Sequence, residues 1–463
     1  MRRTTGLTLL VAAVATVATG VTAAAATTSP PEEARAALQA RVVNALAKVD
    51  GSAASTPAAG RKTRELGQIS LEQTNADVWS HGDFAYVGTW AIPCSGTGVK
   101  IVDVSDPSKP ELVATAAGYP GTSAEDMEVL SVDTPAFTGD LLAVGIQQCS
   151  EEEGFGGLAL WDVTDPTDPE ELGVYENFGV HELSLTERPD GVFALLASPF
   201  SEPFTFFFAP ETIGDFQLVD ITDPANPSLT DDWGALKDAG FPAGAGFIPP
   251  PYDCSDPLCR GAFAAIFAHS TKPSGDGTTA YVAYWDLGAV VLDISDPTDV
   301  TFVGRTVYPL ASDGDTHSAV PNGDDSLLAT TDEDFSPVDL PTKVPGDTWG
   351  FARLWDISNP SSPVRLSDVT TPHSLTNKTD AFYSAHNPEF AGDKLYVSWY
   401  SDGLRIFDVS DPASPREIGF YRGQPNRGLL SPRPIPLDWG VHVEGGRIYL
   451  SDMSVGLYII EEK

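Results

Sequence analysis

A short pattern that recurs along the chain limits the fold of this protein more than any other feature of its sequence. The pattern is a run of alternating β-branched and large apolar residues that ends in an acid and is followed by an Asx-Pro pair, as in LRIFDVSDPASP from Leu404. The acids that end the run are Asp103, Asp162, Asp220, Asp293, Asp356, Asp408 and Glu461. They lie 59, 58, 73, 63, 52 and 53 residues apart, so one unit occurs in seven copies, which indicates a repeat architecture.

Each unit has the features of a β-meander. The alternation before the acid is typical of a strand, and a glycine five positions before the acid, such as Gly98 or Gly403, marks the hairpin turn that leads into this strand. The Asx-Pro pair favours a type I turn, because proline fixes the backbone angle and the Asx side chain caps the turn. Four short antiparallel strands per unit, repeated seven times, predict an all-β protein that folds as a seven-bladed β-propeller of four-stranded antiparallel blades.

The two ends of the repeat region predict how the array closes. A lone strand of the outer type is expected at residues 65–69, and the chain ends after an inner hairpin and a strand that begins at Gly456. We therefore expect the N-terminal strand to complete the last blade, so that no sheet edge is left exposed. A stacked β-solenoid is the competing architecture, and it is disfavoured because its coils are shorter and its ends need caps.

The motifs IVDVSDP, GLRIFDVSDP and GLYII resemble those of the LVIVD-repeat family of secreted bacterial β-propellers, which includes the choice-of-anchor B proteins. The resemblance extends over residues 64–463. It implies a propeller at the cell exterior, and it implies no established reaction. No catalytic residue is therefore carried over from the family, and whether the protein is an enzyme stays open.

Two segments of different composition precede the repeats. Residues 1–26 begin with Met-Arg-Arg, continue with apolar and small residues and end in an Ala-rich cleavage site, which predicts a signal peptide for general or twin-arginine export. Residues 27–63 form an Ala/Pro/Ser-rich leader and linker, in which residues 32–48 have the pattern of a short helix opened by proline. We expect this leader to be either a spacer from the cell surface or a remnant of export.

The charge of the chain excludes two classes of partner. With 65 acidic and 27 basic side chains, the formal net charge is -38. Nucleic acids are bound through clustered Lys and Arg, and anionic lipids attract basic segments, so neither fits this surface. No other run reaches membrane-spanning length. The sequence predicts a secreted, extracellular and monomeric protein without a membrane span in its mature form.

The four cysteines are consistent with export, because an even count in an exported chain predicts disulfides. Cys254 and Cys259 bracket four residues inside the longest insertion between repeats and are expected to staple that loop. Cys94 and Cys149 follow the second strand of consecutive units, which predicts a bridge between neighbouring blades. A cysteine metal site or a catalytic thiol is the alternative, but the chain has no CxxC spacing.

Histidines are the best candidates for a binding or catalytic site. Five of the seven fall in the segment between the outer strand of one unit and the next hairpin: His181, His269, His317, His386 and His442. In a propeller this segment leads into the innermost strand, so we expect the five imidazoles around the mouth of the central channel. Neutral imidazole binds Zn, Cu, Fe or Ni, which makes a transition metal a candidate cofactor. Glu182, Asp332 and Glu333 lie close to these histidines in sequence and are further candidates.

Two alternatives stay open at this point. In the first, each histidine has only a structural role and hydrogen-bonds the backbone of a neighbouring blade. Calcium is disfavoured, because the acidic turns at residues 275–277 and 313–315 do not match a calcium-binding loop. Aromatic residues outside the repeat pattern, such as Trp90, Trp285 and Trp439, either pack between blades or offer a surface to a carbohydrate or peptide. The function predicted from sequence is a ligand- or protein-binding module, and a metal-dependent oxidase or hydrolase is the alternative.

Overall fold

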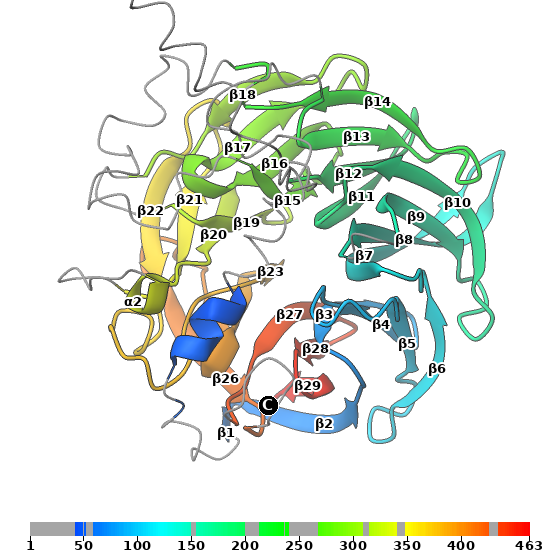
Figure 1. Ribbon diagram of the computed structural model, residues 1–463. Helices are drawn as coiled ribbons and strands as arrows, with labels where there is room; N and C mark the ends of the chain where they lie inside the picture. The colour runs from blue at the N-terminus through cyan, green and yellow to red at the C-terminus, as the bar shows by residue number, and fades with distance from the viewer. Residues whose placement is uncertain are drawn as a thin grey trace, which may run out of the picture.

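The computed structural model describes residues 42–49, 51, 59–149, 154–199, 213–235, 237–239, 267–308, 314–339, 348–425 and 434–463. The predicted signal peptide and the predicted Cys254–Cys259 pair lie outside these residues. Within them the chain is all-β, as the sequence predicts, and its strands form antiparallel sheets that are mostly four-stranded. The fold is β-propeller-like (Figure 1).

The strands fall into four groups by their position in a sheet, counted outward from the middle of the molecule. The inner strands are β3 (Asn75–His81), β7 (Thr122–Asp133), β11 (Glu182–Arg188), β15 (Ala268–Pro273), β19 (Thr316–Pro321), β23 (Pro388–Ala391) and β27 (Asp438–Glu444). The second strands are β4 (Phe84–Thr89), β8 (Thr138–Gln148), β12 (Gly191–Ala197), β16 (Thr279–Tyr284), β20 (Leu327–Asp332), β24 (Lys394–Trp399) and β28 (Arg447–Asp452).

Two further groups complete the sheets. The third strands carry the repeat motif and are β5 (Val99–Asp103), β9 (Gly156–Asp162), β13 (Phe216–Asp220), β17 (Gly288–Asp293), β21 (Ala352–Asp356), β25 (Gly403–Asp408) and β29 (Gly456–Glu462). The outer strands are β6 (Glu111–Ala116), β10 (Glu170–Asn177), β14 (Ser228–Trp233), β18 (Thr301–Arg305), β22 (Val364–Val369), β26 (Arg416–Arg422) and β2 (Thr63–Ser70). A short strand, β1 (Ala59–Arg61), adds to the edge of β26.

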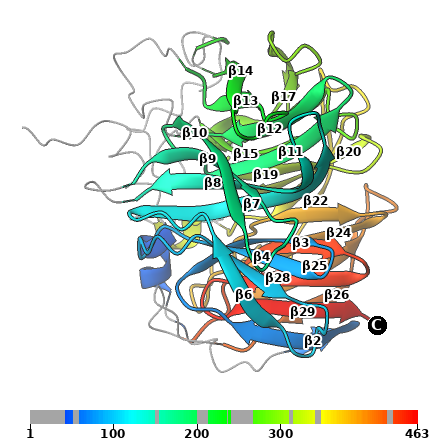
Figure 2. The ribbon, with the colours of Figure 1, turned by 90° about the vertical axis from the view of Figure 1, so that its right-hand side faces the viewer.

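The inner strands surround a common centre. Each contacts two other inner strands, and the cycle of contacts runs β3, β7, β11, β15, β19, β23, β27 and back to β3. The outer strands lie along the outside of the ring in Figure 1, and Figure 2 shows the sheets from the side. Strand β2 is the first long strand of the chain and pairs antiparallel with the last one, β29, from Thr63↔Glu462 to Ser70↔Gly456. Side chains on the inner strands of distant repeats therefore meet at the centre.

The acids that define the repeat have a structural role. The carboxylate of Asp103 accepts the backbone N–H of Ser105, and that of Asp106 accepts the N–H of Ser108, which are Asx-turn hydrogen bonds. The same bond recurs after the third strand of most other sheets, at Asp162, Asp220, Asp293, Asp356 and Asp408. The repeat motif therefore builds the turn from the third to the outer strand, far from the centre of the ring.

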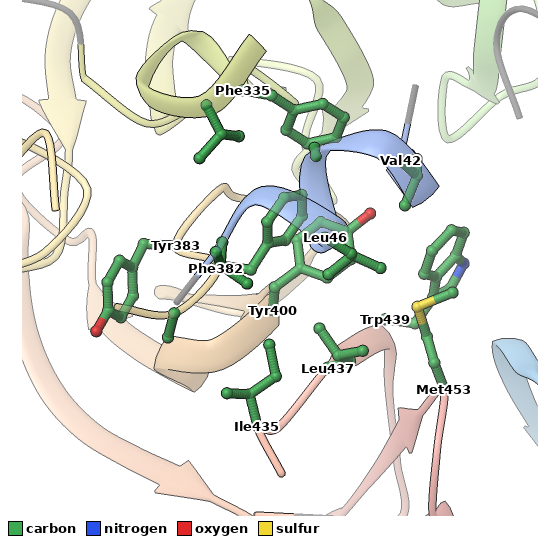
Figure 3. Packing of buried hydrophobic residues seen from close by; sticks show 14 of the residues in the cluster. Val42, Leu46, Phe335, Phe382, Tyr383, Tyr400, Ile435, Leu437, Trp439 and Met453 are labelled. Atoms are coloured by element: carbon green, nitrogen blue, oxygen red, sulfur yellow. The ribbon is translucent and has the colours of Figure 1, made fainter. Parts of the chain in front are cut away.

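A helix over residues 42–48 covers one face of the ring (Figure 2). Its apolar side chains, Val42, Ala45 and Leu46, are buried in a cluster with aromatic residues from several parts of the repeat region, among them Phe382, Tyr400 and Trp439 (Figure 3). The helix lies inside the segment predicted as a helix within the leader. In the structure this part of the leader packs against the repeat region.

A disulfide joins two consecutive repeats in the described part of the chain. Cys94 follows β4 and Cys149 follows β8, and the two form a disulfide, as the sequence predicts. No helix in the described part of the chain has the length and apolar character that a membrane crossing requires.

Candidate functional site

Four of the five predicted histidines meet at the centre of the ring. His181 precedes β11, His269 and His317 are the second residues of β15 and β19, and His386 precedes β23. Their rings follow one another, with centroid separations of 4.2 Å for His181 and His269, 4.1 Å for His269 and His317, and 4.0 Å for His317 and His386. We call these four residues the histidine cluster, and all of them are buried.

His442 lies elsewhere. It is the fifth residue of β27, it stacks on Trp79 with ring centroids 4.2 Å apart, and its Nδ1 is 3.1 Å from Oε2 of Glu389. The residue pairing in each hairpin explains why His442 lies apart from the other four histidines. His442 pairs across its hairpin with Tyr449, as Lys272 pairs with Tyr281, so His442 is the counterpart of Lys272 and not of His269. His442 therefore lies further along its inner strand than the other four histidines, because its segment enters the strand in a different register.

Hydrogen bonds fix which ring nitrogen carries a proton in two members of the histidine cluster. Nδ1 of His386 is 2.9 Å from the carbonyl oxygen of Trp439, so Nδ1 donates and Nε2 holds a lone pair. Nδ1 of His317 is 2.8 Å from Oγ of Ser318, and this hydroxyl donates its own proton to Oδ1 of Asn387 at 3.0 Å. His317 must therefore donate to Ser318, which leaves a lone pair on its Nε2.

The other two histidines are linked to each other. Nδ1 of His181 accepts from the amide of Gln147 at 2.7 Å, and that amide also donates to Glu125 at 3.0 Å. Nε2 of His181 consequently carries the proton and donates to Nε2 of His269 at 2.9 Å. Gln147 and Glu125, two residues not singled out from the sequence, thus orient the first ring of the cluster.

Carboxylates approach the histidine cluster from two sides. Oε1 of Glu182 is 3.7 Å from Nδ1 of His269 and 3.8 Å from Nε2 of His317. Oε1 of Glu333 is 3.9 Å from Nε2 of His386, and the hydroxyl of Tyr400 donates to this same oxygen. Asp332, also predicted from sequence, instead forms an ion pair with Arg353. Glu182 and Glu333 therefore belong to the site, while Asp332 stabilises its surroundings.

Burial keeps two rings of the histidine cluster, His317 and His386, neutral. Desolvation, followed by the neighbouring imidazoles of His386, His269 and His181, holds the pKa of His317 well below its ordinary value. Desolvation lowers the pKa of His386 to about 3, although the carbonyl of Trp439 acts in the opposite direction. Neutral imidazole is the form that binds metal ions.

A cavity of about 20 Å³, enough for a water molecule or an ion, lies against the histidine cluster. Its lining includes all four rings, Glu125, Gln147 and Glu333. Val42 of the helix over residues 42–48, Trp90 and Trp439 also line it, so this helix and the two indoles lie on one side of the cluster.

A second cavity, of about 330 Å³, occupies the centre of the ring beside the histidine cluster. It is lined by residues further along the inner strands, and we call it the carboxylate cavity because its ionisable lining is mostly acidic. These ionisable residues are Asp77, Asp126, Glu128, Glu182, Glu389, Lys272 and His442. Glu182 belongs both to this lining and to the surroundings of the histidine cluster.

Several carboxylates in this cavity also join neighbouring sheets. Asp126 and Glu128 of β7 accept the backbone N–H groups of Leu183 and Leu185 in β11, each at 2.7 Å. Glu389 of β23 accepts the N–H of Val443 in β27 at 3.0 Å. These neighbouring inner strands are connected by hydrogen bonds from backbone N–H groups to acidic side chains. The bonds fix the positions of the acids that line the cavity.

Asp77 differs from the other acids of the cavity. One of its oxygens accepts from Asn387, and the other, Oδ2, has no hydrogen-bond partner among the described residues although the side chain is only 6% exposed. Desolvation, then Asp126 and Glu125, hold the pKa of Asp77 well above its ordinary value. Desolvation likewise raises the pKa of Asp126 to about 7, against the effect of Lys272.

Lys272 is the cation of the carboxylate cavity. Its Nζ is 2.5 Å from Oε1 of Glu128 and 5.7 Å from the centre of the Trp79 ring. Desolvation by itself would lower the pKa of Lys272, but Glu128 and Asp126 outweigh it, so the pKa is raised and the side chain is an ammonium. The cavity thus already holds one ammonium group between carboxylates and an indole.

Comparisons with known proteins agree with the repeat. The model of the LVIVD repeat matches residues 74–117, 276–307, 354–371 and 389–422. No curated protein matches the chain in sequence. Similar solved structures include the crystal structure of the computationally designed Ika8 protein, which has 8% sequence identity and a TM-score of 0.47 over 86% of this chain and 99% of that chain.

Proposed function

Because the chain carries LVIVD repeats on a β-propeller-like fold, we propose that it is an exported, monomeric binding module whose carboxylate cavity takes a small organic cation with a primary ammonium group. The ligand enters the centre of the ring and not an outer loop. The observation that carries this proposal is Oδ2 of Asp77, a buried carboxylate oxygen without a partner among the described residues that lines a cavity of about 330 Å³.

The size and charge of the carboxylate cavity support a small cationic ligand. Its volume is within the range of small-molecule pockets. Five carboxylates line it against one lysine and one histidine, so an anion would be repelled there. An ammonium group can bridge Asp77 and Glu182. Without such a group, the charges of the neighbouring acids act unfavourably on both carboxyl groups.

Lys272 indicates the chemistry that the cavity prefers. Its own ammonium lies between Glu128 and the Trp79 ring, a combination of charge-assisted hydrogen bond and cation–π contact. A ligand of the same kind would place a second ammonium near Asp77. A carbohydrate would need more neutral hydrogen-bonding groups than this acidic wall offers.

The finer architecture is part of the proposal. We infer seven blades, with β2 as the outer strand of the last one, and support comes from the β2–β29 pairing and from the contacts that link all the inner strands. Deleting residues 59–70 should then lower the melting temperature by about 3 °C, the effect of losing about 2–3 kcal/mol in a domain of this size. A melting temperature unchanged within error would contradict closure by this strand.

Export is proposed on two grounds. The Cys94–Cys149 disulfide is a bond that persists in oxidising compartments, and residues 1–26 have the composition of a signal peptide. Amino-terminal sequencing of the protein recovered outside the cytoplasm should begin at or near residue 27. Recovery from the cytoplasm alone with residue 1 in place would contradict export.

Calorimetric titration with butane-1,4-diamine tests the ligand class. The full mature chain should bind the diamine, while butane-1,4-diol, of similar shape but neutral, should not bind. The raised pKa of Asp77 means that a bound ammonium displaces a proton from this carboxyl group. Asp77→Asn keeps the shape of the side chain and cannot become a carboxylate, so it should weaken diamine binding by about 10–100-fold, the loss of one charge-assisted hydrogen bond.

The matched control is Glu170→Gln, which removes one negative charge from the exposed outer strand β10 and should leave the affinity unchanged. Equal heats for diamine and diol would overturn the proposal. So would a loss of affinity in Glu170→Gln as large as that in Asp77→Asn, because it would show that only the net charge of the protein attracts the ligand.

A further inference from the structure

The structure points to a second site, distinct from the carboxylate cavity in place and in ligand. We propose that the histidine cluster binds one divalent transition metal ion through His269, His317 and Glu333. One ligand atom from each of these three buried residues lies within 4.8 Å of the other two. This inference goes beyond the proposed binding of an organic cation and does not depend on it.

Two hydrogen-bond acceptors face each other in the histidine cluster. Nε2 of His386 holds a lone pair, has no hydrogen-bond partner among the described residues, and lies 3.9 Å from Oε1 of Glu333, which already accepts from the hydroxyl of Tyr400. Nε2 of His317 also holds a lone pair, and His317 belongs to the same group of three closely spaced ligand residues as Glu333. A lone pair and a carboxylate oxygen repel each other unless a proton or a cation lies between them. This convergence of buried acceptors is the observation that points to a cation site.

The dimensions of the cluster fit such an ion. Zinc binds nitrogen at about 2.0–2.1 Å, so donor atoms around a tetrahedral ion are about 3.4 Å apart. The three ligand atoms lie within 4.8 Å of one another, so they surround one point and have to close in on the ion when it binds. The cavity of about 20 Å³ that they line has room for the ion itself.

The surroundings orient the proposed ligands as metal sites require. Ser318 accepts from Nδ1 of His317, which leaves Nε2 to the ion, and the hydroxyl of Tyr400 donates to the carboxylate of Glu333. His386 is held by the carbonyl of Trp439 and faces Glu333, where it can approach as a fourth ligand. Such outer contacts set the ring orientation and the protonation of metal-binding histidines.

A second triad, made of His181, Glu182 and His269, also has donor atoms within 4.8 Å of one another. It is disfavoured for two reasons. Nε2 of His181 carries the proton that it donates to His269, and Glu182 lines the carboxylate cavity and not the small cavity beside the rings. His181 is therefore assigned a positioning role. Its Nε2–H donates to His269 in the metal-free protein, and the bond from His269 to the ion replaces this hydrogen bond when the metal binds.

The choice of ion follows from the donor set. Two or three imidazoles and one carboxylate suit Zn²⁺, Fe²⁺, Cu²⁺ or Ni²⁺, whereas Ca²⁺ and Mg²⁺ prefer oxygen ligands throughout. The carboxylate cavity, with Glu182 at the border, gives cations a route from solvent, since the opposite face is covered by Val42 and Trp439.

Titration with Co²⁺ tests the site, because bound Co²⁺ gives visible ligand-field bands that report on nitrogen ligation. The full mature chain is first treated with a chelator and checked by elemental analysis, and Co²⁺ or Zn²⁺ is then added alone. The wild type should bind one ion per chain. His317→Ala and Glu333→Gln should each weaken binding by more than about 100-fold, and Ser318→Ala by about 10–100-fold, the usual effect of removing an outer contact.

The matched control is His442→Ala, which removes a buried histidine of the same channel outside the cluster and should bind Co²⁺ as the wild type does. Glu182→Gln should weaken Co²⁺ binding less than Glu333→Gln does, because Glu182 belongs to the other triad. If His317→Ala fails to fold, His317→Gln replaces it, because its amide can still donate to Ser318. Circular dichroism and thermal unfolding establish the fold of every variant before titration.

Three outcomes would overturn the proposal: no stoichiometric Co²⁺ or Zn²⁺ binding by the folded wild type, loss of binding in His442→Ala, or loss in Glu182→Gln with binding retained in Glu333→Gln. The last would assign the ion to the other triad. Asp77→Asn should retain Co²⁺ binding, so failure of the proposed amine site and failure of the metal site can be told apart.

Discussion

The two ends of the channel are built from the same inner strands and differ in chemistry because their side chains come from different positions along those strands. His269 is the second residue of β15 and belongs to the histidine cluster, whereas Lys272, three residues later, lies in the carboxylate cavity. Likewise His386 precedes β23, and Glu389, within it, lines the cavity. Position along an inner strand therefore sets depth in the channel, and depth decides whether a side chain meets imidazoles or carboxylates.

The two ends also differ in how they are closed. The histidine cluster is covered by the helix over residues 42–48, whose apolar side chains fill a cluster of aromatic rings (Figure 3). The carboxylate cavity has no such cover among the described residues, and its walls are held by hydrogen bonds between acids and backbone N–H groups. One end depends on apolar packing and the other on charge, so they should respond differently to mutation and to pH.

Truncation of the covering helix should have the largest effect on stability. Leu46 is 1% exposed, and Leu46→Ala should lower the free energy of unfolding by about 2–5 kcal/mol, because it removes buried methyl groups and leaves a cavity. Denaturant unfolding of the full mature chain measures this. Leu112→Ala, on the exposed side of β6, is the control and should change stability little. Equal effects would mean that the helix does not close this end.

Removing the ammonium from the carboxylate cavity should come next. Lys272→Met leaves Glu128 and Asp126 without their cation, and a broken buried ion pair costs about 3–5 kcal/mol. The side chain of Lys272 is 31% exposed, so we expect about 2–3 kcal/mol, below that range. Arg416→Met breaks the exposed pair with Asp408 and should cost no more than about 1 kcal/mol. Lys272→Met at or above wild-type stability would refute this charge balance.

Acid should destabilise the histidine end of the metal-free protein. His386 keeps a pKa of about 3 when folded and regains an ordinary value near 6.5 when unfolded, so the unfolded state binds more protons between these limits. Stability is therefore lost as the pH falls below about 6.5, by up to about 1.4 kcal/mol per pH unit for this residue. His386→Gln should flatten that slope in chelator-treated protein. An unchanged slope would contradict the neutral state of the ring.

Raising the pH above about 4 should lower the stability of the carboxylate end, by less than acid lowers the stability of the histidine end. The pKa of Asp77 is raised in the folded state, so the folded protein holds a proton there that the unfolded chain releases above about pH 4. The stability contributed by this proton is present at low pH and is lost as the pH rises through the folded pKa. Asp77→Asn, which cannot titrate, should make stability less dependent on pH above about 4. A steeper dependence in the variant would contradict a raised pKa at Asp77.

Much of the fold could be predicted from sequence because the repeat motif is local. The alternating run before each acid and the Asx-Pro turn after it are decided by neighbouring residues, and the structure has Asx hydrogen bonds at these turns. The Cys94–Cys149 disulfide could be predicted because both cysteines follow equivalent strands of adjacent units. The packing of Val42 and Leu46 could not, since a helix of this length gives no sign of what it covers.

The site was predictable only in part. The four histidines of the cluster were found because they share a place before or at the start of inner strands. His442 lies outside the cluster although the sequence of its segment looks similar, and counting back from Tyr449 gives its register. Asp77, Asp126 and Glu128 were missed because acids are common throughout this chain, and only the ring brings β3 and β7 against β11 and β15. Asp126 and Glu128 lie two residues apart in β7, and this alternation is the sequence signal that places both side chains on one face of the strand.

The claim that the channel holds two separate cation sites is tested most directly by crossed titrations. Wild type, His317→Ala and Asp77→Asn are each titrated with Co²⁺ and, in separate experiments, with butane-1,4-diamine. We predict that His317→Ala loses Co²⁺ binding and keeps the diamine, while Asp77→Asn weakens the diamine and keeps Co²⁺. If each variant, folded as the wild type, lost both ligands to the same extent, the two ends would be one site and the claim would be wrong.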